Sequence, residues 1–162
     1  MRLPEEEWPF LNPFTNLEQI KSFTLVLIDI QNFKEINDTM GHLCGDIILK
    51  EVAKVLKESV RHQDSVIRYG GDEFLIIFLN CPEEKVYERT TYIQRMLSDI
   101  SCKGNKNHTI GADFGVAHTT CFEKTGEFME KIIRQADTLM YQNKKAKKDK
   151  KRVLLECAAK QS

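Results

Sequence analysis

Apolar residues follow two different spacings along the chain. A continuous apolar run at 23–30, FTLVLIDI, has the length and composition of a buried strand. Two shorter apolar runs, at 66–69 and 72–78, lie on either side of the dipeptide Gly70-Gly71. Glycine accommodates the positive φ angles of a tight turn, so these two runs predict a β-hairpin.

Two further segments complete the predicted sheet: a strand at 108–119 and a last edge strand at 153–155. Between the strands, apolar residues recur at helical spacing over 46–60, 83–100 and 128–140. The chain has no internal repeat and no long linker rich in Pro, Gly or Ser. The pattern predicts an α/β fold, an α+β sandwich in which a central, mostly antiparallel, five-stranded sheet is flanked by helices.

The length of the chain, 162 residues, is typical of a single domain. Residues 1–22 show little periodicity and are predicted to form an irregular or short-helical lead-in. We expect the domain itself to span residues 23–157 and to be followed by a tail at 158–162.

The composition is that of a soluble globular protein, with 41% hydrophobic and 30% charged residues. Lysine plus arginine (24) equals aspartate plus glutamate (24), so the chain offers no basic field for a nucleic-acid backbone. Binding to DNA or RNA is therefore not expected. No apolar run approaches the ~18 residues that predict a membrane span, so no membrane segment is expected.

The five cysteines are scattered along the chain without a C-x-x-C pair. This pattern argues against a disulfide framework or a zinc site and favours reduced thiols. The amino terminus, MRLPEEEWPF, is acidic where a signal peptide is basic. Together these features predict a cytoplasmic location.

Candidate chemistry lies at the end of the first strand and in the hairpin. Asp29 is at the end of the 23–30 strand and Asp72 follows the Gly-Gly turn, so the two carboxylates are expected to face each other across adjacent strands. Such a pair supplies hard oxygen ligands for a divalent cation, with Mg²⁺ as the natural choice. A cation held there suits phosphoryl transfer, because it neutralises charge on a triphosphate. The alternative is an ordinary solvated hairpin, which an isolated G-G-D-E more often is.

A set of motifs removes that ambiguity. Arg68–Phe74 spells RYGGDEF, the signature of diguanylate cyclases of the GGDEF family, and the sequence resembles this family over roughly residues 23–155. The other blocks that resemble family patterns are 29–38 with Gly41-His42 and Gly45-Asp46 (D-x-D-x-F-K-x-I-N-D, G-H and G-D), 114–117 (the end of S-I-G-V-A), and 136–144 (A-D-x-A-L-Y-x-A-K).

The resemblance implies a fold akin to the palm of nucleotide polymerases and class III adenylyl cyclases. It implies a nucleotidyltransferase, a diguanylate cyclase that condenses two GTP into cyclic di-GMP and two pyrophosphates. The implied cofactor is Mg²⁺, with Mn²⁺ as an alternative. Because each of two facing domains presents one GTP, a homodimer, at least a transient one, is also implied. An upstream sensor domain outside this chain is a further implied partner.

Family roles carry over position by position. Asp29, Asp72 and the backbone carbonyl of Ile30 are implied metal ligands, and Asp72 and Glu73 are the implied catalytic residues. The implied substrate-binding residues are Asn32, Phe33, Lys34, Asn37, Asp46, Gly70, Gly71, Lys144 and Lys148.

Within this set, backbone N–H groups between Ile30 and Lys34 are implied to bind phosphate at the start of a helix. Asn37 and Asp46 are the implied guanine-binding residues. A carboxylate accepts from both guanine N1–H and N2–H₂, which favours GTP over ATP. Outside the family context, helix capping is the simpler explanation for Asn37 and Asp46, and solvated charge is the simpler one for Lys34 and Lys144.

Arg61 and Asp64 form an R-x-x-D motif that ends shortly before the Gly-Gly turn. Many family members have an inhibitory product site at this position. The resemblance therefore implies feedback inhibition by cyclic di-GMP, with arginine as a bidentate donor and aspartate as an acceptor from guanine. An isolated R-x-x-D is usually solvated charge.

The chain departs from the family pattern at three places. Gln31 replaces the second acid of D-x-D, and Asn12–Leu17 matches the D-x-L-T-G-L-x-N-R motif only in part. A lysine-rich run at 144–152 replaces G-R-N, and Lys148 is the implied substitute for its phosphate-binding arginine. Such a run is by itself usually a solvated helix end.

Two other classes of function remain as alternatives. One is a non-catalytic receptor or regulatory module that binds cyclic di-GMP or GTP, and the other is a structural or dimerising module. The intact acids at Asp29, Asp72 and Glu73 argue against the first, and the nucleotide-binding chemistry of Asn37 and Asp46 argues against the second.

Overall fold

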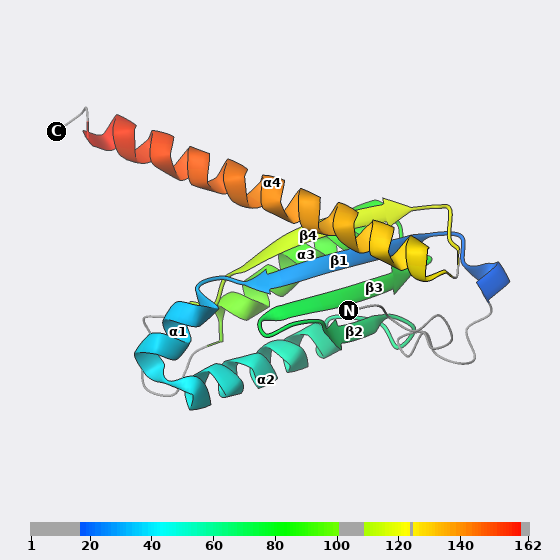
Figure 1. Ribbon diagram of the computed structural model, residues 1–162, viewed down its shortest axis with the longest axis horizontal. Helices are drawn as coiled ribbons and strands as arrows, with labels where there is room; N and C mark the ends of the chain where they lie inside the picture. Colours follow the sequence, from blue (N-terminus) through cyan, green and yellow to red (C-terminus); the bar gives the residue numbers. More distant parts are fainter. Residues whose placement is uncertain (1–16, 101–108, 124, 160–162) are drawn as a thin grey trace.

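The computed structural model describes residues 17–100, 109–123 and 125–159, and only the backbone is described for 151–159. Four antiparallel strands form one sheet in the order β2-β3-β1-β4 (Figure 1). The strands are β1 (Phe23–Ile30), β2 (Ser65–Arg68), β3 (Glu73–Leu79) and β4 (Ala112–Thr119). The helices are the 3₁₀ helix η1 (Leu17–Gln19), α1 (Phe33–Met40), α2 (His42–Glu58), α3 (Glu83–Ser98) and α4 (Gly126–Ala159).

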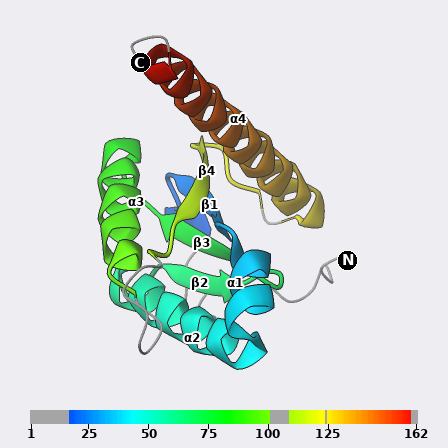
Figure 2. The same ribbon diagram turned by 90° about the vertical axis from the view of Figure 1, so that its left-hand side faces the viewer.

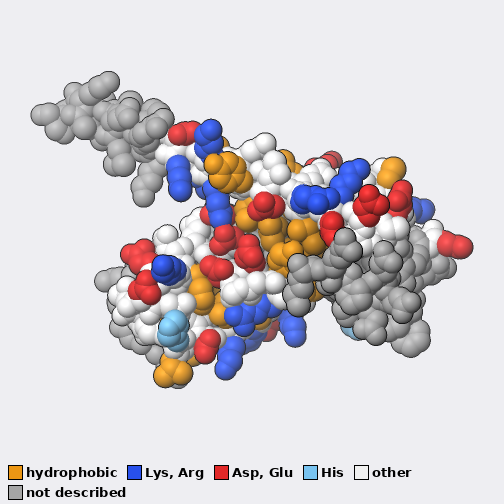
Figure 3. Space-filling model, viewed as in Figure 1, with side chains coloured by type: hydrophobic (Ala, Val, Ile, Leu, Met, Phe, Trp, Pro, Cys, Tyr) orange, Lys and Arg blue, Asp and Glu red, His pale blue; other side chains and the backbone are white. Residues whose placement is uncertain are grey.

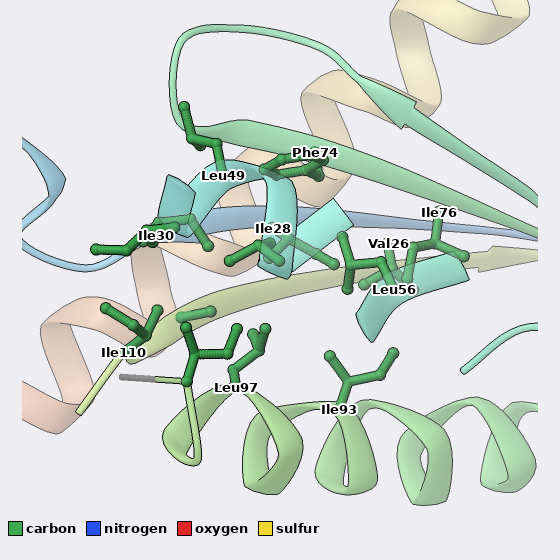
Figure 4. Packing of buried hydrophobic residues seen from close by; sticks show 14 of the residues in the cluster. Val26, Ile28, Ile30, Leu49, Leu56, Phe74, Ile76, Ile93, Leu97 and Ile110 are labelled. Atoms are coloured by element: carbon green, nitrogen blue, oxygen red, sulfur yellow. The ribbon is translucent and has the colours of Figure 1, made fainter. Parts of the chain in front are cut away.

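Helices cover both faces of the sheet, with α4 on one face and α2 and α3 on the other (Figure 2). Strand β1 pairs with β3 on one side and β4 on the other, which explains why its sequence is apolar nearly throughout. Its alternate side chains enter two separate cores. Val26 and Ile28 pack with residues of α2 and α3 such as Leu56 and Ile93 (Figure 4), whereas Leu25 and Leu27 belong to the core under α4.

Gly115 on β4 brings α4 unusually close to the sheet. A Cβ atom at this position would lie 1.9 Å from the carbonyl oxygen of Ala136, so only glycine fits against the backbone of α4. Asn143 Nδ2 then donates to the carbonyl of Phe114 at 3.1 Å, directly before the lysine-rich part of the helix. These contacts fix how α4 crosses the end of the sheet.

The predicted mixed fold with a mostly antiparallel, helix-flanked sheet is confirmed, but the fifth strand is wrong. Residues 153–155 continue α4 instead of forming an edge strand. The segment 127–159 contains neither glycine nor proline and is rich in lysine and alanine. No residue in this segment ends the helix, so the strand propensity of the apolar residues at 153–155 does not produce a strand.

The predicted hairpin is confirmed as β2–β3, but the reason given for its glycines is wrong. Gly41 is the glycine with positive φ among the described residues, and neither Gly70 nor Gly71 has this conformation. Residues 69–72 connect the two strands, and this connection is longer than the two-residue loops that need mirror-image turns. A Cβ at Gly70 would lie 2.6 Å from Glu73 Oε2, so a larger residue there would displace the end of the Glu73 side chain.

The expectation of reduced cysteines is wrong for Cys44, which is disulfide-bonded. Cys81 and Cys121 are free. Sequence spacing cannot predict such a bond, because a disulfide requires Cα atoms within about 7 Å in the folded chain.

No helix in the described ranges is both long and apolar enough to cross a membrane.

Candidate functional site

Three carboxylates form a row across one end of the sheet. Asp29 on β1 is paired in register with Glu73 on β3 and with Asp113 on β4. Residues directly opposite each other in antiparallel strands point to the same face, here the face covered by α4. Figure 3 shows acidic side chains gathered at this end of the sheet, beneath the basic side chains of α4.

Two lysines of α4 neutralise this row. Lys144 Nζ donates to Asp29 Oδ2, and one turn later Lys147 Nζ donates to Asp113 Oδ1 at 2.8 Å. The spacing of three residues puts both ammonium groups on one face of the helix. The close approach of α4 at Gly115 thus brings the ammonium groups of Lys144 and Lys147 within hydrogen-bonding distance of the strand-end acids.

The loop after β1 is shaped for anion binding. Asn32 has φ 56° and ψ 24°, a left-handed conformation that asparagine tolerates well, and α1 begins at Phe33. The first N–H groups of a helix have no acceptor within the helix, and they carry a partial positive charge. Lys34 is exposed in the same turn. The loop backbone is held in place by the Gln31 N–H, which donates to the carbonyl of Gly111 at 2.9 Å.

The hairpin turn is tied against the end of β1. The Ile30 N–H donates to the carbonyl of Asp72 at 3.2 Å, which links the two segments that carry the predicted metal ligands. Arg68 Nη2 donates to the carbonyl of Gly71 at 2.7 Å and braces the turn from the other side. The turn, the loop after β1 and α4 enclose an open hollow of about 600 Å³. Its lining is Asp29, Ile30, Gln31, Asn32, Phe33, Lys34, Asp72, Asp113, Lys144, Lys147 and Lys148.

Glu73, which is paired with Asp29 and follows Asp72 in the sequence, lies among other acids at this end of the sheet. Burial raises the pKa of Glu73 above its ordinary value of 4.5, and the charges of Asp29, Asp72 and Asp137 raise it further, while Lys144 opposes the shift. A carboxylate whose ionisation is disfavoured by its neighbours indicates a site where a bound cation would relieve repulsion. The oxygen donors of Asp29 and Asp72 have the chemistry that Mg²⁺ prefers, so these residues fit a divalent cation.

The predicted guanine-binding residues lie at the junction of α1 and α2. The side chain of Asn37 lies against Gly45, where a Cβ would be 2.0 Å from Asn37 Oδ1. Asp46 is exposed and lines a separate hollow of about 520 Å³ together with Arg68 and Phe74. The structure thus places Asn37 and Asp46 outside the hollow that contains Asp29 and Asp72, on the other side of the hairpin turn.

The R-x-x-D motif lies at the opposite end of β3, about 20 Å from the turn at ~3.4 Å per residue. Arg61 donates through Nε and Nη2 to both carboxylate oxygens of Asp64, at 2.9 and 2.8 Å, and also to the carbonyl of Leu79 at 3.0 Å. The Asp64 side chain is 0% exposed, whereas that of Arg61 is 43% exposed. The hydrogen bond to Asp64 raises the pKa of Arg61. In this arrangement Asp64 holds Arg61 and does not itself face a ligand.

The guanidinium of Arg61 borders a hollow of about 440 Å³ that also contains Lys85, Arg89 and Tyr92 of α3. These α3 residues were not among the predicted site residues, and neither were Asp113 and Lys147 in the first hollow. For Asp113 a signal was present, because a carboxylate interrupts an otherwise apolar strand; for Arg89 there was none, since an arginine on an amphipathic helix is ordinary.

Several known diguanylate cyclases are similar to this chain in sequence. Diguanylate cyclase A of Treponema denticola is 32% identical over 128 residues, which are 78% of this chain and 34% of that protein. Diguanylate cyclase DgcS of Shewanella oneidensis is 34% identical over 125 residues, which are 76% of this chain and 39% of that protein. The chain therefore spans little more than a third of the length of these relatives.

The fold matches solved structures of the same kind. The GGDEF domain of DgcB from Caulobacter crescentus, solved in complex with c-di-GMP, has a TM-score of 0.67 and 27% sequence identity, covering 77% of this chain and 73% of that one. A family model described as diguanylate cyclase, GGDEF domain, matches residues 12–150. That range contains both strand-end acids, the hairpin and the lysines of α4, and the chain thus belongs to the GGDEF diguanylate cyclase family.

Proposed function

We propose that this domain condenses two molecules of GTP into cyclic di-GMP with release of two pyrophosphates. The observation that carries the proposal is the 600 Å³ hollow, in which the carboxylates of Asp29, Asp72 and Asp113, a helix-opening loop and three lysines of α4 meet. Carboxylates suit a divalent cation, and N–H groups and lysines suit a triphosphate. A structural module has no use for this combination.

Asp29 and Asp72 would hold the cation, with the Ile30 carbonyl as a further oxygen. When bound, Mg²⁺ or Mn²⁺ supplies neutralising charge to the triphosphate and lowers the pKa of a hydroxyl beside it. Glu73 is paired with Asp29 in the sheet register and follows Asp72 in the sequence, and burial together with the charges of these acids raises its pKa. Its role is to add negative potential that favours cation binding.

The phosphates would be held by the loop backbone and by lysines. The amides of Asn32, Phe33 and Lys34 open α1, where unpaired donors and the helix dipole both favour an anion. Lys144 and Lys148 line the same hollow from α4. Because amides and ammonium groups recognise phosphate and not the base, this part of the site fixes the triphosphate and leaves base selection to other residues.

Asn37 and Asp46 would select guanine. Gly45, which precedes Asp46 in α2, leaves room for the Asn37 side chain of α1, and this contact supports one binding surface. A carboxylate at position 46 accepts from guanine N1–H and N2–H₂, a donor pair that adenine lacks. Gly70 and Gly71 keep the hairpin free of side chains between this surface and the phosphates.

Catalysis would require two copies of the domain, each presenting one GTP. In each of two steps a 3′-hydroxyl oxygen forms a bond to the α-phosphorus of the other nucleotide, the bond from that phosphorus to the pyrophosphate oxygen breaks, and the hydroxyl proton is lost to solvent. The hollow is open, which supports access by a second nucleotide carried on a facing copy. A homodimer, formed at least transiently, is part of the proposal.

The test is pyrophosphate release from GTP with Mg²⁺, comparing the unaltered protein with Asp72→Ala and with Asp99→Asn as a matched control. Asp99 is exposed at the end of α3, away from both hollows. We expect Asp72→Ala to remove turnover while thermal unfolding is unchanged and Asp99→Asn to retain it. Full turnover in Asp72→Ala would overturn the assignment of the metal ligands, and absence of turnover combined with tight binding of cyclic di-GMP would favour the receptor function.

We also propose that cyclic di-GMP inhibits the enzyme from the hollow at Arg61. The exposed guanidinium of Arg61, the cation of Arg89 and the ring of Tyr92 supply donors and a stacking surface for guanine and phosphate. The solved DgcB domain, which was crystallised with c-di-GMP, is a relative in which a domain of this family binds the product. Arg89→Ala should raise the concentration of cyclic di-GMP needed for half-inhibition about tenfold, as expected for loss of one charge-assisted contact. An unchanged inhibition curve would contradict this part of the proposal.

A further inference from the structure

Three side chains that depart from the family pattern meet at one point in the structure. Gln31 stands in place of the second acid of D-x-D, and Asp113 stands where S-I-G-V-A has serine. If Lys148 replaces the arginine of G-R-N, Lys147 replaces its glycine. Gln31 Nε2 and Lys147 Nζ both donate to Asp113 Oδ1, at 2.9 and 2.8 Å. Residues from the loop after β1, from β4 and from α4 thus form one polar triad.

The centre of this triad is a buried carboxylate. The side chain of Asp113 is only 9% exposed, and burying a carboxylate is unfavourable unless it is paired and hydrogen-bonded. Its two partners meet that requirement from opposite sides. Gln31 is itself fixed, because its N–H donates to the carbonyl of Gly111 and its side-chain oxygen packs where a Cβ of residue 111 would stand. Asp113 therefore has one rigid donor and one donor on a long, flexible stem.

Lys147 is the member of the triad that is free to act on a ligand. Its side chain is 51% exposed and lines the hollow proposed for the triphosphate. An ammonium has three donor protons, so one hydrogen bond to Asp113 leaves donors for another anion. Without Asp113, the four-carbon stem of Lys147 would sample many rotamers over this hollow. With it, the ammonium is held in place before a ligand arrives.

The arrangement does not favour Asp113 as a third metal ligand. Its Oδ1 is already occupied by two donors, one of them a cation. Among the residues that the structure describes, no group of three or more His, Cys, Asp or Glu side chains is arranged to hold a metal ion. Asp29 and Asp113 are neighbours across β1 and β4, yet each is bound to a different lysine of α4.

We infer that Asp113 is a positioning residue that holds Lys147 over the hollow, where Lys147 binds the phosphates of GTP. Gln31 completes the arrangement by fixing the carboxylate from the loop side. The inference rests on the proposed function, because it assumes that the hollow receives a triphosphate. It adds to that function a phosphate-binding residue and the group that orients it.

The inference predicts a loss of affinity that depends on the phosphates. The probes are 3′-deoxy-GTP, which lacks the attacking hydroxyl and is not turned over, and GMP, each measured with Mg²⁺ by calorimetry or by competition at millimolar concentration. Lys147→Met is expected to weaken binding of 3′-deoxy-GTP about tenfold, the size of one partly exposed charge-assisted contact, and that of GMP less than about twofold. Lys147→Arg should retain affinity within about twofold, and Lys145→Met, exposed on the same helix, is the matched control.

Asp113→Asn tests the positioning role. We expect Asp113→Asn to weaken binding of 3′-deoxy-GTP nearly as much as Lys147→Met does. The double variant should bind this nucleotide no more weakly than Lys147→Met alone, because the two changes remove the same interaction. Thermal unfolding of Asp113→Asn shows whether this variant folds. Lys147→Met alters a half-exposed side chain, so it tests the inference even if Asp113→Asn does not fold. Equal losses for both nucleotides, or additive losses in the double variant, would overturn the inference. If the unaltered protein binds neither nucleotide, the proposed function fails instead.

Discussion

The two ends of strand β3 both carry charged side chains, but these side chains are paired in different ways. At the Leu79 end, Asp64 is completely buried and Arg61, three residues away, satisfies both of its oxygens. At the Glu73 end, Asp29 is partly exposed and Asp113 is buried, and their partners Lys144 and Lys147 come from α4, far away in the sequence. One end is a closed local pair and the other is an open set of charges drawn from several elements.

This difference indicates that the charged pair at the Leu79 end serves mainly stability, whereas the charged groups at the Glu73 end serve mainly function. The Arg61–Asp64 pair stabilises the connection between α2 and β2 and presents one guanidinium to solvent. At the opposite end, burial and the neighbouring acids disfavour ionisation of Glu73, which is unfavourable in the free protein and useful for binding a cation. We therefore expect substitutions at the Glu73 end to affect chemistry first and those at the Arg61 end to affect stability first.

The largest effect is expected at the open end. Asp29→Asn removes a proposed metal ligand, and since a metal ion contributes several kcal/mol of charge stabilisation, turnover should fall on the order of 10³-fold. The free energy of unfolding should change little, because Asp29 and Lys144 are both partly exposed. Steady-state assays with GTP and urea unfolding of the same sample measure the two quantities. A stable variant with more than a tenth of the original turnover would contradict this contrast.

Gly115→Ala tests the connection between the sheet and the lysines. The added Cβ would overlap the carbonyl of Ala136, so α4 must shift away from β4. Overpacking of this kind should lower the free energy of unfolding by about 3 kcal/mol and also weaken GTP binding, because Lys144 and Lys147 move with the helix. Urea unfolding and nucleotide titration measure the two effects.

Gly71→Ala is the control for stability, since nothing lies within 4 Å of a Cβ there. It should remain within about 0.5 kcal/mol of the unaltered protein. If Gly115→Ala were equally harmless, the close packing of α4 on β4 would not be what positions the lysines.

Arg61→Ala should act mainly on stability. It leaves the Asp64 carboxylate buried without its charged partner, which is expected to lower the free energy of unfolding by about 2 kcal/mol. Initial turnover in the absence of product should be retained. Arg89→Ala, which removes an exposed arginine from the same hollow, is the control and should leave stability within about 0.5 kcal/mol. Equal stabilities of the two variants would show that the Arg61–Asp64 pair does not support the fold.

The smallest effect is expected from Glu73→Gln, and it has the opposite sign. The pKa of Glu73 is raised in the folded protein, so at neutral pH the ionised side chain opposes folding, and this penalty develops as the pH rises above the ordinary value of 4.5. In the absence of divalent cations, Glu73→Gln should therefore be slightly more stable than the unaltered protein at pH 7. The difference should vanish near pH 4, and thermal unfolding at both values checks it. A loss of stability at pH 7 would contradict the conclusion that burial and the neighbouring acids disfavour the ionised form of Glu73.

The contrast between the two ends also explains what the sequence predicted well. The hairpin is a local feature, and the short motif around Gly70 and Gly71 was enough to predict it. The sequence predicted Arg61 and Asp64 as joint ligands of a product and did not predict that they pair with each other. The Asp113–Lys147 contact joins residues 34 positions apart and depends on how closely α4 packs at Gly115, which no local pattern specifies. The wrong fifth strand has a related cause, because the apolar residues at 153–155 have strand propensity but follow an uninterrupted helix.

The most direct test of the central claim is to identify the product by mass spectrometry after incubating the purified protein, freed of bound nucleotide, with GTP and Mg²⁺ and, in parallel, with ATP and Mg²⁺. The account predicts cyclic di-GMP and pyrophosphate from GTP and no cyclic dinucleotide from ATP. Intact GTP in a folded sample that binds Mg²⁺ and GTP would contradict the claim that this hollow is an active site.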